Sequence, residues 1–188
     1  MTTYIPSITI PTAVFQSPAA SILLPVTLGL AVGYSTGRSQ TQNTYRSLRL
    51  PPLRPPPWIF APVWTVLYGL MGYSAYRATT TGLSLLASPE QAASAKQGMT
   101  LYTLQLVLNL VWQPLFFSAN RPKEATVDII ALLGLNGYLT YVWSSVDEVS
   151  AWCQVPYLAW LSFATYLSAG TGYLNNWDLK SGATKKNL

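Results

Sequence analysis

The chain has 188 residues, of which 50% are hydrophobic and only 9% are charged. Soluble domains usually carry about 25% charged residues, so this composition argues against a water-soluble single domain, and a soluble protein of buried helices is the alternative. The net charge of +5 comes from basic residues scattered along the chain, without the single patch or stripe that binds nucleic acid. We therefore expect a membrane protein with the lipid bilayer, and no nucleic acid, as its partner.

Five apolar segments follow one another along the chain, each close to the length of about 20 residues that a helix needs to cross a bilayer. They cover residues 17–36, 62–80, 98–118, 125–143 and 155–173. The sequence thus predicts an all-α membrane protein, a five-transmembrane-helix bundle over residues 17–177. Residues 1–16 are expected to form an N-terminal tail, and residues 178–188 a basic cytosolic tail.

The first segment carries a row of small residues, Gly29, Gly33 and Gly37, at intervals of four. Such a row lets another helix approach the backbone closely. The fifth segment repeats the spacing with Ala164, Ser168 and Gly172. Two uses stay open for these rows, a homodimer interface and close packing within one chain, and a five-helix bundle favours the second.

The linker between the first two segments, residues 38–61, ends in a run of prolines. Proline fixes its own φ and holds the preceding residue extended, so Pro55, Pro56 and Pro57 predict a short, stiff rod. Pro62 suits the first turn of the second helix, where its missing N–H costs nothing. Residues 80–97 are polar enough for a surface loop.

Basic residues are unequally divided between the two ends of the expected bundle. One end has Arg77 and Lys96, whereas the other has Arg38, Arg46, Arg49, Arg54, Arg121, Lys123, Lys180, Lys185 and Lys186. Because basic residues collect on the cytosolic side, the proline-rich linker and the C-terminus are predicted to be cytosolic.

The chain contains no histidine, which removes histidine-based metal sites and catalytic triads. It also lacks a P-loop and a Rossmann glycine motif. The sequence therefore predicts no metal site and no obligatory cofactor, and conventional catalysis has few candidate residues.

Aromatic and polar side chains instead form stripes at helical spacing on three segments. The stripes are Trp64 and Tyr68 on the second segment, Asn109, Trp112 and Phe116 on the third, and Tyr157, Trp160 and Ala164 on the fifth. Flat aromatic walls suit a flat apolar ligand. Trp143, Trp152 and Trp177 are expected to be anchors at the membrane interface.

Polar groups within the segments are Gln105, Asn109 and Asp128. Such groups normally face the bundle interior and find partners there. Hydrogen bonds between helices are one role. Ligand orientation by Asn109 is the other, with Asp128 fixing a helix start beside Arg121 or Lys123.

Three stretches of the sequence carry a resemblance to a known family. PPLRPPPWIFAPVWTVLYGLMGY (residues 51–73), QLVLNLVWQPLFF (105–117) and PYLAWLSFATYL (156–167) resemble the signature, third helix and fifth helix of the TspO/MBR family, the translocator proteins. The resemblance implies a five-helix bundle, often dimeric, that binds porphyrins, sterols and benzodiazepine-type ligands. In eukaryotes it implies the mitochondrial outer membrane with a cytosolic C-terminus.

The resemblance and the stripes together give the candidate ligand site. Its residues are Trp58, Ala61, Pro62, Trp64, Tyr68, Asn109, Trp112, Phe116, Trp160, Ala164 and Leu167. Trp64 and Trp160 also match tryptophans implicated in light- and oxygen-dependent porphyrin degradation in some members. The functional hypotheses are porphyrin binding or transport, porphyrin degradation with Trp64 and Trp160 as the catalytic residues, and a stress-response membrane scaffold.

Three departures from the family pattern are present, one of which is Leu167-Ser168 in place of the family's Leu-Asn on the fifth helix. Glu124 stands where mammalian members carry a tryptophan, which alters one wall of the expected pocket. The C-terminal sterol motif is incomplete, because Lys180 lies one residue too far from Tyr173. Porphyrin is therefore favoured over sterol as the ligand.

Overall fold

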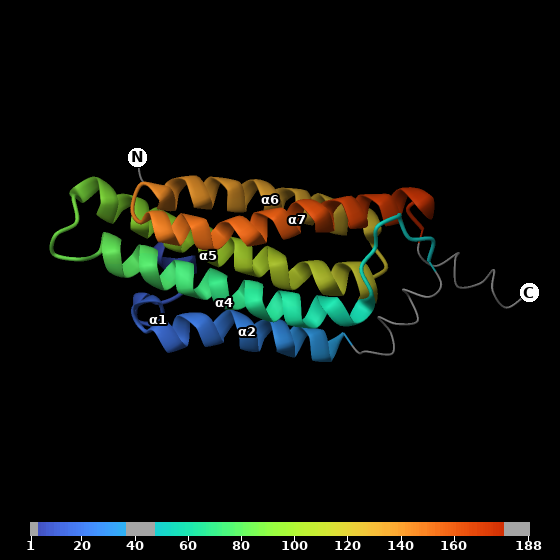
Figure 1. Cartoon of the computed structure of the whole chain (residues 1–188), viewed down its shortest axis with the longest axis horizontal. Helices are drawn as coiled ribbons and strands as arrows, with labels where there is room; N and C mark the ends of the chain where they lie inside the picture. Colours follow the sequence, from blue (N-terminus) through green and yellow to red (C-terminus); the bar gives the residue numbers. More distant parts are fainter. Residues whose placement is uncertain (1–3, 37–47, 179–188) are drawn as a thin grey trace, which may run out of the picture.

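The computed structural model describes residues 4–36 and 48–178 of the chain. Five long helices lie side by side and alternate in direction (Figure 1). They are α2 (Pro18–Ser35), α4 (Pro57–Gly82), α5 (Pro89–Gln113), α6 (Pro122–Ser144) and α7 (Glu148–Leu174). No strand occurs in the described residues. The predicted all-α five-helix bundle is confirmed.

Proline and capping side chains set where these helices begin. Pro18, Pro57, Pro89 and Pro122 each start a helix, where the missing N–H breaks no hydrogen bond. Ser88 caps α5 in a reciprocal pair with Gln91, in which each side chain accepts a hydrogen bond from the other residue's backbone N–H. The proline and capping residues that follow the linkers therefore fix where these helices begin.

The second helix begins earlier than the sequence analysis predicted. Helix α4 starts at Pro57, so Pro62 lies inside the helix and the prediction that it forms the first turn is wrong. Pro56 is extended, with φ −58° and ψ 143°, as a stiff proline segment requires. Pro62 is the sixth residue of α4, so it removes the hydrogen bond that an N–H at this position would donate to the Trp58 carbonyl.

The predicted surface loop over residues 80–97 is also wrong. Helix α4 continues to Gly82 and α5 begins at Pro89, which leaves only residues 83–88 between them. Gly82 permits this tight turn, since a Cβ there would lie 2.4 Å from the Cβ of Ala95. Arg77, assigned to this linker from the sequence, lies within α4.

Residues before α2 pack on the bundle. They include a short 3-10 helix η1 (Pro6–Ile8) and α1 (Thr12–Gln16). The Ile5 and Ile10 N–H groups donate to the hydroxyls of Thr100 and Thr103 on α5, at 3.1 and 3.0 Å. Phe15 is 1% exposed and meets the ring of Tyr102 edge-on at 5.6 Å. Much of the segment expected to be a tail is thus a packed element of the fold.

Helix α2 packs closely against α4 through small residues. The Ser21 hydroxyl donates to the Gly72 carbonyl at 2.7 Å, and a Cβ at Gly72 would lie 2.3 Å from the carbonyl oxygen of Ser21. Gly29 faces the ring of Tyr68, where a Cβ would lie 2.2 Å from a ring carbon. Gly29 therefore serves packing within the chain, whereas Gly37 lies outside the described residues.

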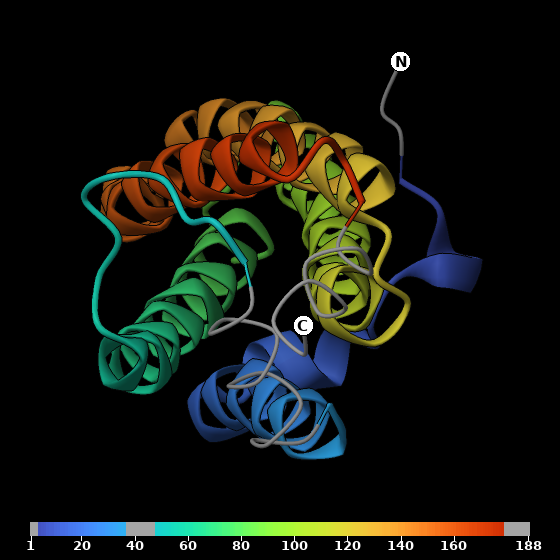
Figure 2. The ribbon, with the colours of Figure 1, turned by 90° about the vertical axis from the view of Figure 1, so that its right-hand side faces the viewer.

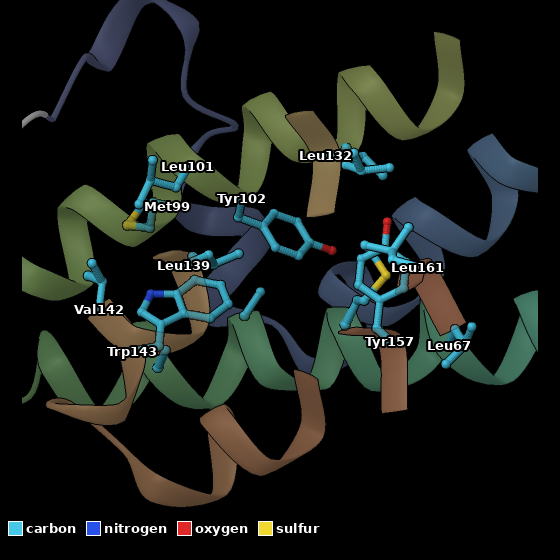
Figure 3. Close-up of a cluster of buried hydrophobic side chains, with 14 of the residues drawn as sticks. Leu67, Met99, Leu101, Tyr102, Leu132, Leu139, Val142, Trp143, Tyr157 and Leu161 are labelled. Carbon is cyan, nitrogen blue, oxygen red and sulfur yellow. The ribbon is translucent and has the colours of Figure 1, made fainter. Parts of the chain in front are cut away.

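Figure 3 shows the tightly packed core of the bundle. Trp143 is completely buried there and stacks on Tyr102 with ring centres 5.8 Å apart. Gly98 makes room for its indole, since a Cβ would lie 1.9 Å from the indole nitrogen. The prediction that Trp143 anchors the membrane interface is wrong because this glycine lets the indole enter the core. Trp152, by contrast, is 65% exposed.

By length and hydropathy alone, two of the described helices, α2 and α6, are suited to crossing a membrane. The mean hydropathy of the other long helices is lowered by polar side chains that face the interior. Examples are Ser74 on α4, Gln105 on α5 and Gln154 on α7, all completely buried. Gln154 donates to the Ser74 hydroxyl at 3.2 Å, and the Gln105 Oε1 accepts from Asn136 and Tyr157, so these groups have partners inside the bundle.

Candidate functional site

Residues 48–56, which we call the strap, cross one end of the bundle. Figure 2 looks onto this end and shows the strap running along α7 and then down to the start of α4. We call this the strap end, and the opposite end, with the α4–α5 and α6–α7 turns, the far end. Of the nine basic residues of the majority side, Arg49, Arg54, Arg121 and Lys123 lie at the strap end. The other five, Arg38, Arg46, Lys180, Lys185 and Lys186, lie outside the described residues.

Side chains on both elements hold the strap in place. Asn175, just after α7, pairs with the backbone of Arg49, accepting from its N–H at 3.1 Å and donating to its carbonyl at 2.8 Å. The Tyr166 hydroxyl donates to the Pro52 carbonyl at 3.0 Å. Pro51 sits against Gly170, where a Cβ would come within 3.0 Å of the proline ring.

The strap also contributes to an apolar cluster beneath it. Leu48 is buried together with Phe116, Phe117 and Ala125. Phe116 and Phe117 belong to η2 (Pro114–Ser118), a π-helical turn that continues α5. Pro114 cannot donate a backbone hydrogen bond, and the Ala119 N–H closes the wider turn by donating to the Pro114 carbonyl at 2.9 Å. The turn brings both phenylalanine rings under the strap.

The α4 and α7 stripes predicted from the sequence meet inside the strap end, where Trp160 also contacts Phe60 of α4 at 5.8 Å. The α5 stripe joins them through the hydrogen bonds of Asn109. We call Trp64, Tyr68, Trp112, Phe116, Tyr157 and Trp160 the aromatic site. The Trp64 ring lies 5.4 Å from Tyr68 and 6.1 Å from Tyr157, and Trp112 stacks on Phe116 at 5.2 Å. Trp64, Trp112 and Trp160 are each only half-buried, in contrast to Trp143 in the core. The aromatic site therefore keeps indole surface that no protein atom covers.

A chain of hydrogen bonds crosses the bundle beside these rings. Tyr68 on α4 donates to the Asn109 Oδ1 at 2.5 Å, and the Asn109 Nδ2 donates to the Tyr157 hydroxyl at 2.7 Å. Tyr157 and Asn136 both donate to the Oε1 of Gln105 at 3.4 Å. Asn109 thus fixes two tyrosine rings of the site, as the hydrogen-bonding role predicted, and both of its bonds are made within the protein.

Several residues of the predicted ligand site lie outside the aromatic site. Trp58 is 73% exposed on the first turn of α4, and Ala61 and Pro62 are also exposed. Ala164 packs on the core cluster, and Leu167 is half-buried one turn further along α7. The sequence analysis missed Asn175 and Tyr166, since no spacing signal links them to the strap. Tyr157 was on a recognised stripe but was left out of the candidate site.

Asp128 does not have its predicted role. Helix α6 begins at Pro122, so Asp128 lies in the second turn and does not fix the helix start. Arg121 instead approaches Glu124, at 3.8 Å. Asp128 is 9% exposed, and its Oδ2 has no hydrogen-bond partner. The prediction fails because Pro122 starts the helix six residues earlier.

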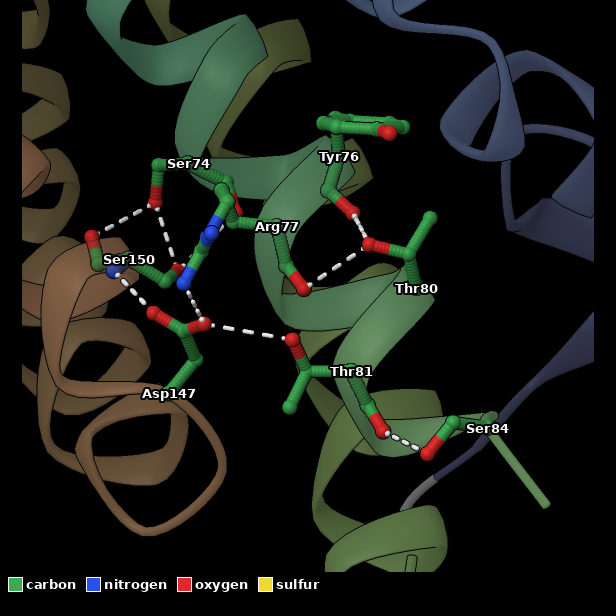
Figure 4. A network of polar contacts seen from close by, with 8 residues as sticks. All are labelled: Ser74, Tyr76, Arg77, Thr80, Thr81, Ser84, Asp147 and Ser150. Atoms are coloured by element: carbon green, nitrogen blue, oxygen red, sulfur yellow. Dashed lines mark hydrogen bonds and ion pairs between the residues drawn. The ribbon is translucent and has the colours of Figure 1, made fainter. Parts of the chain in front are cut away.

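Figure 4 shows a separate polar cluster at the far end. Asp147 caps α7 by accepting from the Ser150 N–H at 2.8 Å, and it pairs with Arg77 of α4 at 2.6 Å. Burial opposes ionisation of Asp147, but the bonds from Ser150, Arg77 and Thr81 outweigh it and lower the carboxyl pKa below its usual value. Both oxygens of this carboxylate have partners and join α4 to α7, while the Nε of Arg77 is a buried donor without one.

A shallow surface hollow of about 430 Å³ lies on the outer side of η2. It is lined by Val111, Pro114, Leu115, Ser118 and Ala119. None of these residues belongs to the aromatic site or to the hydrogen-bond chain. The hollow therefore does not coincide with the candidate ligand site.

Comparison with known proteins agrees with this architecture. Residues 21–174 match the model of the TspO/MBR family. The translocator protein homolog of Schizosaccharomyces pombe is 34% identical over 165 residues, which cover 87% of this chain and 95% of that protein. The human translocator protein is 36% identical over 151 residues, covering 80% and 86%. The tryptophan-rich protein TspO of Chlorobaculum tepidum is 33% identical over 152 residues, covering 79% and 91%.

Proposed function

Because the chain belongs to the TspO/MBR family, we propose that this integral membrane protein binds a flat hydrophobic ligand in the aromatic site beneath the strap. Porphyrins are the first candidates, and sterols and benzodiazepine-type molecules are the alternatives. The names "translocator protein" and "tryptophan-rich protein TspO" of the relatives are in keeping with this proposal. Transport of the same ligand is a further step of the proposal.

One observation carries the proposal, the incomplete burial of the indoles in an otherwise close-packed bundle. Trp64, Trp112 and Trp160 are half-buried, whereas the core next to them includes completely buried Leu161 and Tyr157. Offset stacking on a planar ring would cover the remaining indole surface at a gain of about 0.5–1.5 kcal/mol per ring pair beyond area burial. A flat aromatic or polycyclic ligand would cover this remaining indole surface.

The strap supplies the charge that a porphyrin needs. Arg49 and Arg54 are exposed on the strap, and the guanidinium group pairs well with carboxylates. A porphyrin with its ring in the aromatic site would direct its propionates toward these arginines. The positive end of the molecule would be cytosolic by the charge rule, with the mitochondrial outer membrane as the proposed location in a eukaryote.

Titration of the purified protein with protoporphyrin IX, followed by tryptophan fluorescence quenching, tests this function. We expect saturable quenching in the wild type and at least tenfold weaker binding when Trp64 and Trp160 are both changed to Ala, since two stacking partners are lost. Trp152→Phe, at an exposed far-end position, is the matched control and should bind normally. Unchanged binding by the double variant would refute the site.

Light-dependent degradation of bound porphyrin is a second candidate function. It is favoured by the position of Trp64, whose ring lies within 6.1 Å of Tyr157 and 5.4 Å of Tyr68. Oxidisable rings would then surround a photosensitising ligand. Illumination of the complex in air should yield a new bilin-like absorption band that Trp160→Phe abolishes. Bleaching at the rate of free porphyrin, with no new band, would exclude this activity.

A further inference from the structure

Asp128 is a buried carboxyl group without the partner that its position requires. The residue is 9% exposed, and its Oδ2 is fully covered and unbonded. The ion pair nearest along the helix joins Arg121 to Glu124 and leaves Asp128 out. An acidic side chain inside a membrane bundle is costly and normally faces a partner or a functional cavity. Its unpaired oxygen therefore needs an explanation.

The position of Asp128 relates it to the aromatic site. It lies on the inward face of α6, between buried Ala125 and buried Leu132. Ala125 belongs to the cluster under the strap and Leu132 to the main core, and Trp112 packs against both clusters. The carboxyl group thus lies at the level of the aromatic site, on the wall that α6 provides.

The other polar groups at this level are either paired within the protein or are donors. Both polar atoms of the Asn109 side chain are hydrogen-bonded, to Tyr68 and Tyr157, so neither is free for a ligand. Thr126 and Ser168 bond to each other across α6 and α7 at 3.0 Å. The indole nitrogens of Trp112 and Trp160 are buried donors without partners, and the Oδ2 of Asp128 is a buried acceptor without one. A second unpaired acceptor on α6, the Asn136 Oδ1, lies eight residues further along the helix.

We propose that Asp128 is a specificity-determining residue that accepts a hydrogen bond from an N–H or O–H group on the edge of the bound ligand. The inference rests on the proposed function and deepens it by naming the ligand chemistry, a flat apolar molecule with an edge donor. A sterol hydroxyl supplies such a donor, whereas the N–H groups of a porphyrin lie at the ring centre and would leave Asp128 unpaired. A donor would satisfy the oxygen in either protonation state of the carboxyl, whereas an ionised acidic group at this edge would be repelled by the carboxylate. Anionic groups of a ligand would then lie toward the strap arginines.

A matched ligand pair tests the inference on the full-length protein in lipid nanodiscs. Carbazole and dibenzofuran have nearly the same tricyclic shape, but carbazole has an N–H where dibenzofuran has an oxygen. We expect the wild type to bind carbazole at least tenfold more tightly by calorimetry, after subtraction of the heat from empty nanodiscs. Asp128→Leu should reduce this ratio to about one.

Two further variants distinguish the loss of the Asp128 carboxyl group from a general loss of folding. Asp128→Asn keeps an acceptor oxygen on a side chain of nearly the same size, so it should retain part of the carbazole preference. This variant keeps the test usable if Asp128→Leu folds poorly. Val127→Leu, on the exposed side of the same turn, should keep the full ratio. Equal wild-type affinities for the two tricycles, or a ratio unchanged in Asp128→Leu, would overturn the role of Asp128.

Titration of the same preparations with protoporphyrin IX distinguishes a failure of the inference about Asp128 from a failure of the proposed function. If protoporphyrin IX binds and the tricycles bind equally or not at all, the inference about Asp128 fails and the proposed function stands. If neither protoporphyrin IX nor a tricycle binds, the proposed function fails and the inference falls with it.

Discussion

At the scale of single residues, some buried polar side chains join helices and others keep an unpaired atom, and Gln105 does both. Asn109 and Asp147 each connect two or more elements through short hydrogen bonds, whereas Asp128, Trp112 and Trp160 keep an unpaired buried atom. Helical spacing predicted the aromatic stripes, since it depends on the helix alone. It could not predict burial of Trp143, which depends on Gly98 of another helix.

Asp147 gives a pH dependence to the stability of the bundle. Its pKa is lower in the folded protein than the usual value of about 3.9, so its contribution is present above that value and is lost as the pH falls through the lowered one. Asp147→Asn should cost about 1 kcal/mol at pH 7, since Arg77 is partly exposed and the ion pair is screened. Thermal unfolding in detergent from pH 7 to pH 3 should show this gap between the proteins narrowing in acid. A constant gap would contradict the role of Asp147.

At the scale of elements, helix positions follow from the sequence more reliably than helix ends. The five apolar segments all became helices, but α4 and α5 extend well beyond the predicted bounds, at Pro57 and Pro89. Polar residues at these ends are compatible with helix because the ends need not lie in the hydrocarbon core. The strap contacts could not be predicted, because Asn175 lies 126 residues from Arg49 along the chain.

Two glycines on α4 test the close packing of α2 on α4. Gly72→Ala would place a Cβ 2.3 Å from the carbonyl oxygen of Ser21, so the helices must separate, at an expected cost of 1–3 kcal/mol. Gly69→Ala is the control, since nothing lies within 4 Å of its added Cβ. That change should be neutral or stabilise by up to about 1 kcal/mol through helix propensity. Equal melting temperatures for the two variants would contradict the packing of α2 on α4.

The strap is predicted to control how fast a ligand leaves. Asn175→Ala removes both bonds to Arg49, and Tyr166→Phe removes the bond to Pro52 while keeping the ring. We expect each variant to raise the dissociation rate of protoporphyrin IX several-fold in stopped-flow experiments, because a released strap no longer covers the aromatic site. Tyr173→Phe, at an exposed position near the same end, should leave the rate unchanged. Rates equal to wild type in both strap variants would show that the strap does not cover the ligand.

At the scale of the whole molecule, the two ends of the bundle differ in packing and charge. The far end is joined by the Asp147 cluster and the buried serines, and the strap end carries most of the basic residues and the aromatic site. Composition and charge spacing were enough to predict the bundle and this asymmetry of charge. The difference in packing required the structure, because it arises from contacts between separate helices.

The seven tryptophans provide the most direct test of the proposal that the strap end binds the ligand. Their indole N–H signals can be assigned by single substitutions and followed by NMR during titration with protoporphyrin IX. We predict that the signals of Trp64, Trp112 and Trp160 shift saturably together, while those of buried Trp143 and far-end Trp152 stay in place. Shifts led by Trp152, or spread evenly over all seven signals, would contradict a ligand site beneath the strap.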